Sequence, residues 1–155
     1  MAVITRILYP TDLSEHAAAA LAPAATLART FRAEVVLLHV IEPLPLLSDS
    51  YFPPATWEAY AEETRAEAMA RLDLLARQLK AEGVTVTTRL ATGPVVSSIL
   101  KVAEEEGVNL IAIGTHGRTG LSSVLLGSVA DKIVRLAPCP VLTVRSPAPP
   151  PEERR

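Results

Sequence analysis

Two hydrophobic periodicities alternate along the chain. Short apolar runs rich in β-branched residues, and one segment at 84–90 in which apolar and polar residues alternate, are separated by longer segments in which apolar residues recur at helical spacing. Such runs are typical of strands covered on both faces, and the longer segments are typical of amphipathic helices. Strands are predicted at residues 3–9, 34–41, 84–90, 108–113 and 140–144, and helices at 14–31, 56–82, 95–106 and 128–137.

Glycine and proline mark the boundaries of these elements. Pro10 ends the first run because proline cannot donate a ladder hydrogen bond. The segment 42–54 contains four prolines and is predicted to be a loop. Gly83 is a suitable left-handed end for the second helix, and Pro23 predicts a bend within the first helix.

The alternation of strand and helix predicts a three-layer α/β domain. Parallel strands joined by right-handed crossovers place helices on both faces of the sheet. Ligands bind such sheets beyond the carboxyl ends of the strands, where the strand order reverses. We therefore expect three segments to converge there, at residues 10–12, 39–41 and 114–128.

Composition narrows the class of protein further. The chain has 155 residues, is 49% hydrophobic and carries a formal net charge of -2, which indicates one domain, expected at 1–146, before a proline-rich solvated tail at 147–155. This charge balance argues against a binder of nucleic-acid phosphates, and no apolar run reaches the ~20 residues that span a bilayer. A single cysteine and an N-terminus without an apolar signal core indicate a cytoplasmic location.

Glycine is concentrated in one window. Four of the seven glycines lie within residues 114–127, a window with neither a Walker A loop nor a Gly-x-Gly-x-x-Gly fingerprint. Glycine permits close backbone approach and positive φ, so amides here could converge on an anion. Gly127 and Ser128 open the last helix, whose free amides favour phosphate. The alternative is a flexible, capped loop that binds nothing.

Two further positions have a functional and a structural interpretation each. Asp12 follows the first strand, where it could cap the next helix, as could Ser14, or accept hydrogen bonds from ribose hydroxyls. The two roles of Asp12 are compatible. Val40, at the end of the second strand, is either plain core or a position whose backbone reads an adenine edge.

These residues resemble a known family. The pattern Gly114-x2-Gly117-x9-Gly127-Ser128, with the residues that follow it to 142, resembles the signature of universal stress proteins of the ATP-binding branch. Residues 7–14 and 37–40 resemble the ends of the family's first two strands. The resemblance extends over about residues 3–144.

The resemblance implies a fold, a ligand and an assembly. The fold is a five-stranded parallel sheet of order 3-2-1-4-5, of the adenine nucleotide alpha hydrolase-like kind. The ligand is ATP, with Mg²⁺ or Mn²⁺ bound through the phosphates, and the assembly is a homodimer formed by antiparallel pairing of the last strands, residues 140–145. Pro10, Thr11 and Asp12 would line the adenosine pocket, with Asp12 on the ribose, and Val40 would contact adenine. The remaining implied ligand-binding residues are Gly114, Thr115, His116, Gly117, Arg118, Gly127, Ser128 and Val129.

Several functions are compatible with this assignment. A nucleotide-dependent regulator or sensor of the stress response needs only binding, whereas an ATPase or phosphotransferase needs a group that orients the attacking oxygen. His116 is the nearest candidate, although a loop histidine more often serves as a simple polar donor. A nucleotide-independent dimeric scaffold is a third possibility, but the glycine pattern argues against it. His39 is expected to be a satisfied core group and Cys139 an apolar filler.

Overall fold

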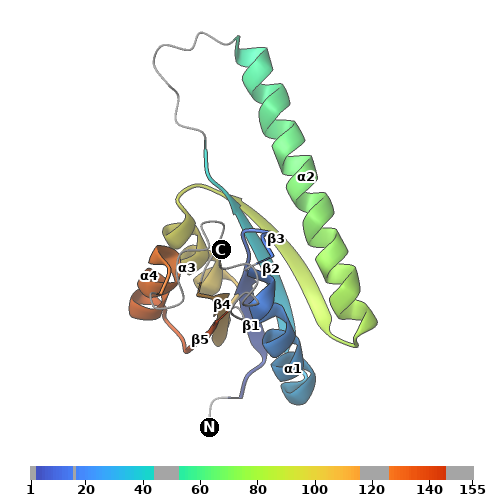
Figure 1. The fold of residues 1–155 in the computed structure, drawn as a ribbon, viewed down its shortest axis with the longest axis vertical. Coiled ribbons are helices and arrows are strands. Elements are labelled where there is room, and N and C mark those ends of the chain that lie inside the picture. The colour runs from blue at the N-terminus through green and yellow to red at the C-terminus, as the bar shows by residue number, and fades with distance from the viewer. Residues whose placement is uncertain (1–2, 16, 44–52, 116–125, 146–155) are drawn as a thin grey trace, which may run out of the picture.

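The computed structural model describes residues 3–15, 17–43, 53–115 and 126–145, and the structural statements below concern these residues. Its five strands are β1 (Arg6–Pro10), β2 (Glu34–Ile41), β3 (Thr85–Thr92), β4 (Leu110–Gly114) and β5 (Val141–Val144). They form one parallel sheet of order β3-β2-β1-β4-β5 (Figure 1). The predicted sheet and its strand order are confirmed.

Helices cover both faces of this sheet. The elements are a 3₁₀-helix η1 (Ala17–Ala20), α1 (Leu21–Phe31), α2 (Pro54–Ala81), α3 (Val95–Glu105) and α4 (Ser128–Leu136). One core cluster joins α1 and α2 to one face, and a second joins α3 and α4 to the other. The predicted three-layer α/β architecture is therefore confirmed.

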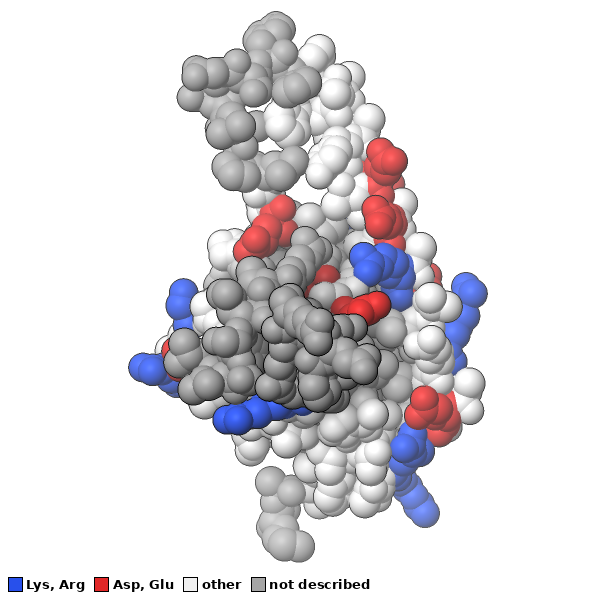
Figure 2. Space-filling view, in the orientation of Figure 1, with Lys and Arg blue, Asp and Glu red and all other residues white. Residues whose placement is uncertain are grey.

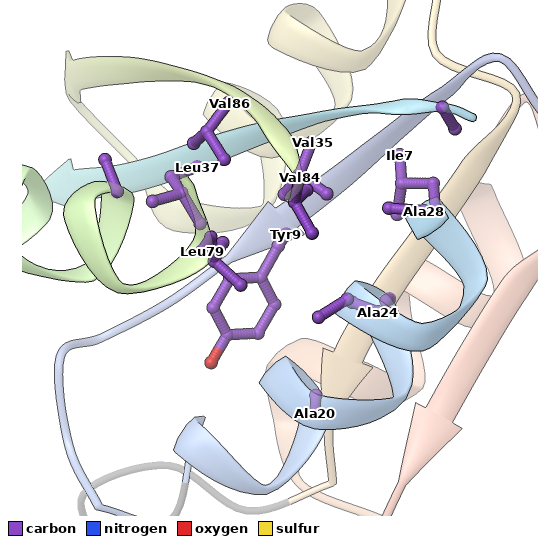
Figure 3. Packing of buried hydrophobic residues seen from close by; sticks show 14 of the residues in the cluster. Ile7, Tyr9, Ala20, Ala24, Ala28, Val35, Leu37, Leu79, Val84 and Val86 are labelled. Carbon is purple, nitrogen blue, oxygen red and sulfur yellow. The ribbon is translucent and has the colours of Figure 1, made fainter. Parts of the chain in front are cut away.

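Alternating strand residues form these two clusters. Ile7 and Tyr9 point toward α1 and α2, as Figure 3 shows, whereas Leu8 between them points toward α3 and α4. All three are almost completely buried. The central strands bury both faces, which explains why their sequences are continuous apolar runs and do not alternate with polar residues.

The first helix differs from its prediction. We predicted one helix over 14–31 bent at Pro23, but the chain forms η1 first and α1 begins only at Leu21. Pro23 consequently lies in the first turn of α1. The first amides of a helix have no intrahelical acceptor, so proline is tolerated there, whereas an α-helix begun at Ser14 would have needed the missing N–H.

The first strand begins at Arg6, later than predicted, because a side chain replaces part of the ladder. The Asn109 Oδ1 atom accepts hydrogen bonds from the backbone N–H groups of Thr5 and Arg6, each at 3.1 Å. Its Nδ2 atom donates to the Val3 carbonyl at 3.0 Å. The Val3 carbonyl and the Thr5 N–H are therefore bonded to a side chain, while the Thr5 carbonyl accepts from the Glu34 N–H of β2, and the sequence pattern does not reveal these contacts.

The long helix α2 was predicted correctly within about two residues at each end. Its C-terminal half packs on the sheet through Leu72 and Leu79, and it ends before Gly83, whose φ of +82° confirms the predicted left-handed stop. Its N-terminal half extends past the sheet (Figure 1), and charged side chains of both signs cover its exposed face (Figure 2).

Candidate functional site

The strand order reverses between β1 and β4. The chain runs outward from β1 to β2 and β3, then returns to β4 beside β1 and continues to β5. The carboxyl ends of β1 and β4, at Pro10 and Gly114, therefore flank the position where doubly wound sheets bind ligands. The predicted segments at residues 10–12 and 114–115 do meet at this edge of the sheet.

The end of β2 borders the same position. The N–H of Thr11 donates to the Leu38 carbonyl at 2.8 Å, whereas the N–H of Gly93 donates to the Ile41 carbonyl at 3.0 Å on the opposite side of β2. Backbone groups of successive strand residues point alternately to the two neighbouring strands. The N–H and C=O of Val40 therefore face the β1 side, beyond the point where β1 ends.

One hydrogen bond brings the last helix to this edge. The N–H of Gly127 donates to the Thr115 carbonyl at 2.7 Å, and the N–H of Thr115 donates to the Val144 carbonyl at 3.0 Å. The two ends of the glycine window are therefore in direct contact, and α4 begins beside the carboxyl end of β4. His116, Gly117 and Arg118 lie outside the described residues.

Among the described residues, no side chain caps the N-terminus of α4. Gly127 is its N-cap residue and has no side chain to accept from the first-turn amides. The Gly127 carbonyl accepts the first helical bond, from the Asp131 N–H at 2.9 Å. Uncapped amides and the positive end of the helix dipole together favour an anion, and Ser128 and Val129 supply the first two of these amides.

Gly127 does not use the positive φ that glycine permits. Its φ is -58°, which every residue adopts readily, and among the described glycines positive φ occurs at Gly83, Gly93 and Gly107. The relevant property of Gly127 is therefore its missing side chain. Aspartate, asparagine or serine at an N-cap would occupy the amides that an anion needs.

The loop after β1 is ordered by its own side chains. The N–H of Leu13 donates to Thr11 Oγ1 at 3.0 Å, and the N–H of Ser14 donates to Asp12 Oδ1 at 2.9 Å. Ser14 Oγ in turn accepts from the Ala17 N–H at 3.2 Å, at the start of η1. Ser14 thus caps the 3₁₀-helix, and Asp12 caps its own turn and not α1.

Two long-range contacts to this loop were not foreseen. His39 Nδ1, which carries the proton, donates to the Thr11 carbonyl at 2.9 Å, which confirms His39 as a satisfied core group but adds a contact to the loop. Arg71 Nη2 donates to the Leu13 carbonyl at 2.5 Å. Arg71 is one of many charged residues on α2, and no sequence signal distinguishes it.

Tyr9 lies beneath this loop as a neutral donor. Burial raises the pKa of Tyr9 to about 12, and the nearby Asp12 charge acts in the same direction, whereas a hydrogen bond with Thr11 opposes them. Its hydroxyl donates to the Ala17 carbonyl at 2.6 Å. Tyr9 therefore joins β1 to η1 and is unsuited to exchange a proton at neutral pH.

Within the described ranges, no three His, Cys, Asp or Glu side chains gather closely enough to hold a metal ion. Over the same ranges, none of the helices combines the length and the hydropathy needed to cross a bilayer.

The fold and this edge define a doubly wound α/β domain in which a helix N-terminus lies beside the topological switch point. The chain belongs to the universal stress protein family, whose family model matches residues 4–145.

Curated relatives are similar over nearly their whole length. A universal stress protein of Methanocaldococcus jannaschii is 34% identical over 144 residues, which cover 92% of this chain and 82% of the relative. A universal stress protein of Thermus aquaticus is 37% identical over 142 residues, covering 90% of this chain and 97% of the relative.

Solved structures share the fold. A second protein of Methanocaldococcus jannaschii matches with a TM-score of 0.83 and 32% identity, covering 96% of this chain and all of the other. A universal stress protein solved with cAMP matches with a TM-score of 0.68 at 22% identity, covering 94% of this chain and 100% of that one. An Arabidopsis thaliana family member solved with AMP bound matches with a TM-score of 0.65 at 18% identity, covering 93% of each chain.

The raised pKa of Tyr9 predicts a loss of stability at high pH. The phenol is neutral in the folded state up to a pKa of about 12, compared with 10.0 for the ordinary group. Its contribution is fully present below pH 10 and is lost as pH rises toward 12, by roughly 3 kcal/mol in total. Urea unfolding measured across this range should show the decline, and it should be smaller in Tyr9→Phe. An identical pH dependence in both proteins would contradict the assignment.

Proposed function

We propose that this universal stress protein binds an adenine nucleotide, with ATP as the ligand, and acts as a nucleotide-dependent regulator or sensor in the stress response. The observation that carries the proposal is the uncapped N-terminus of α4, held by the Gly127 N–H on the Thr115 carbonyl at the point of strand-order reversal. Family members solved with AMP and with cAMP support the choice of an adenine nucleotide.

The adenosine part of the ligand is assigned to the ends of β1 and β2. Val40 would contact the adenine edge through its backbone N–H and C=O, which face the β1 side of β2. Pro10 and Thr11 would line the pocket. The Asp12 carboxylate, which accepts from the Ser14 N–H through Oδ1, would also accept hydrogen bonds from ribose hydroxyls.

The phosphates are assigned to the glycine window and the start of α4. The backbone of Gly127, Ser128 and Val129 would bind them together with Gly114 and Thr115, and the family resemblance adds His116, Gly117 and Arg118. Mg²⁺ or Mn²⁺ would bind through the phosphates. When bound, the ion would offset phosphate charge.

Regulation is favoured over rapid turnover because the titratable groups at this edge make structural contacts. The His39 Nδ1–H donates to the Thr11 carbonyl, and Tyr9 donates to the Ala17 carbonyl. Asp12 accepts from Ser14. Fast phosphoryl transfer requires a group that orients the attacking oxygen, and these three already hold the loop. We therefore assign at most slow hydrolysis to the protein.

We further propose that the protein is a homodimer joined through residues 140–145. The carbonyls of Pro140 and Val144 accept hydrogen bonds from residues 111 and 115. By alternation, the N–H and C=O groups of Val141 and Thr143 face away from β4, at the edge of the sheet. An apolar edge strand of this kind is suited to pairing with a second copy.

Gly127→Asp tests the phosphate site. The new carboxylate would cap the first-turn amides and repel phosphate, so ATP affinity should fall by at least roughly a hundredfold, or about 2.8 kcal/mol. Calorimetry with millimolar Mg²⁺ measures the change. Freshly purified wild-type protein should also release an adenine nucleotide on denaturation, identified by mass spectrometry.

Gly127→Ala is the matched control. At a φ of -58° alanine causes no backbone strain, and it neither caps the amides nor carries charge, so its loss of affinity should be much smaller. Both variants should retain the circular dichroism spectrum of the wild type. Equal ATP affinity in the aspartate variant and wild type would place the site elsewhere, and a wild-type protein that binds no adenine nucleotide would overturn the proposed function.

Phosphate release distinguishes a regulator from an enzyme. With saturating ATP and Mg²⁺, we expect release to take hours and to change little in His116→Ala, because a simple polar donor contributes little to the chemical step. Gly127→Asp supplies the background from contaminating phosphatases. Rapid turnover that His116→Ala abolishes would instead establish an ATPase or phosphotransferase.

Thr143→Pro tests the dimer. It removes an N–H directed away from β4 and leaves the β4 hydrogen bonds at residues 140 and 144 in place. The dimer dissociation constant should rise by about tenfold or more, measured by sedimentation. An unchanged circular dichroism spectrum would show that the monomer fold is intact, and an unchanged dissociation constant would exclude pairing through this strand.

A further inference from the structure

The loop after β1 is held from behind by a side chain of α2. Arg71 Nη2 donates to the Leu13 carbonyl at 2.5 Å, across 58 residues of sequence. Arg71 precedes Leu72, which is fully buried against the sheet, so the helix backbone at this position is fixed to the core. The guanidinium therefore joins the loop after β1 to a helix that is packed on the sheet.

The residue that Arg71 holds has an unfavourable backbone conformation. Leu13 has a φ of +64°, in the left-handed region that a leucine rarely adopts. Such a conformation persists only where surrounding contacts impose it. Its N–H donates to Thr11 Oγ1 at 3.0 Å, and its carbonyl accepts from Arg71. Because the chain turns at Leu13, this conformation sets where the Asp12 carboxylate and the Ser14 amide lie.

Two hollows lie beside this part of the loop. One, of about 240 Å³, lies between the loop and α2 and is lined on its apolar side by Tyr9, Ala18, Leu74 and Leu75. The other, of about 100 Å³, includes His39 and Glu67 in its lining. Leu13 and Arg71 line both, and the Leu13 side chain also packs against the core, so the Arg71 hydrogen bond adds to packing in restraining the loop.

We infer that Arg71 is a positioning residue for the nucleotide site: it fixes the left-handed Leu13 and thereby the orientation of Asp12. The inference rests on the proposed adenosine-binding role of this loop. Arg71 acts through the Leu13 carbonyl and does not touch the ligand. Nucleotide binding and the contact between α2 and the loop are then thermodynamically coupled, and such coupling is reciprocal.

Arg71→Met tests this inference because methionine keeps the length of an apolar stem and removes the donor. We expect the affinities for ATP, AMP and adenosine to fall by the same factor, about tenfold, since the loop is assigned to the adenosine part shared by all three. Amide hydrogen exchange of residues 11–15 should accelerate in the variant. Added ATP should slow exchange in this segment in wild type.

Three further variants separate positioning from general stability. Arg77→Met changes an exposed arginine on the same helix and should leave both affinity and exchange unchanged. Arg71→Lys keeps a charged donor and should restore part of the affinity. In a Leu13→Asn background, where the left-handed conformation is intrinsically more accessible, Arg71→Met should cost less affinity than in wild type.

The outcomes are distinguishable from one another. Unchanged affinity and exchange in Arg71→Met would overturn the inference, as would equal acceleration of exchange throughout the protein, which indicates global destabilisation. If wild type binds no adenine nucleotide, the proposed function fails and the role in the site fails with it. Exchange of residues 11–15 would then still report whether Arg71 restrains Leu13.

Discussion

The 2.7 Å hydrogen bond from the Gly127 N–H to the Thr115 carbonyl determines the geometry of the candidate site. It joins the two ends of the glycine window, residues 114–127, so α4 begins beside the carboxyl end of β4. Thr115 is buried and its own N–H is bonded to β5, so this junction is anchored in the sheet. The helix amides consequently face the place where the strand order reverses.

The second half of the site is ordered by a different means. The loop after β1 contains an unfavourable left-handed leucine, and its conformation depends on side chains from separate elements, His39 of β2 and Arg71 of α2. The start of α4 is thus positioned by backbone contacts close to the sheet, whereas the loop after β1 is positioned by long-range side-chain contacts. Because one of those side chains is Arg71 of α2, the loop after β1 is the part of the candidate site most sensitive to how α2 packs.

The sequence predicts those features that arise from local periodicity. The central strands were found because they bury both faces, residues 84–90 because apolar and polar side chains alternate, and Gly83 because a left-handed helix end favours glycine. Features that depend on particular side chains were missed. The Asn109 side chain bonds to the chain before β1, and Pro23 lies in the first turn of α1. Gly127 was singled out as the residue that opens the last helix, and the structure places it at the N-cap of α4 with a negative φ.

Binding and turnover place different demands on this edge of the sheet. Binding requires backbone amides and a carboxylate that are already oriented, and both follow from contacts within the fold. Turnover would also require a side chain that orients water, whereas Tyr9 and His39 donate to backbone carbonyls, Tyr9 to Ala17 of η1 and His39 to Thr11 of the loop. These contacts hold the chain on either side of Asp12. The proposed role of this edge in holding a nucleotide therefore depends on contacts that the fold supplies, and its proposed coupling to α2 depends on Arg71.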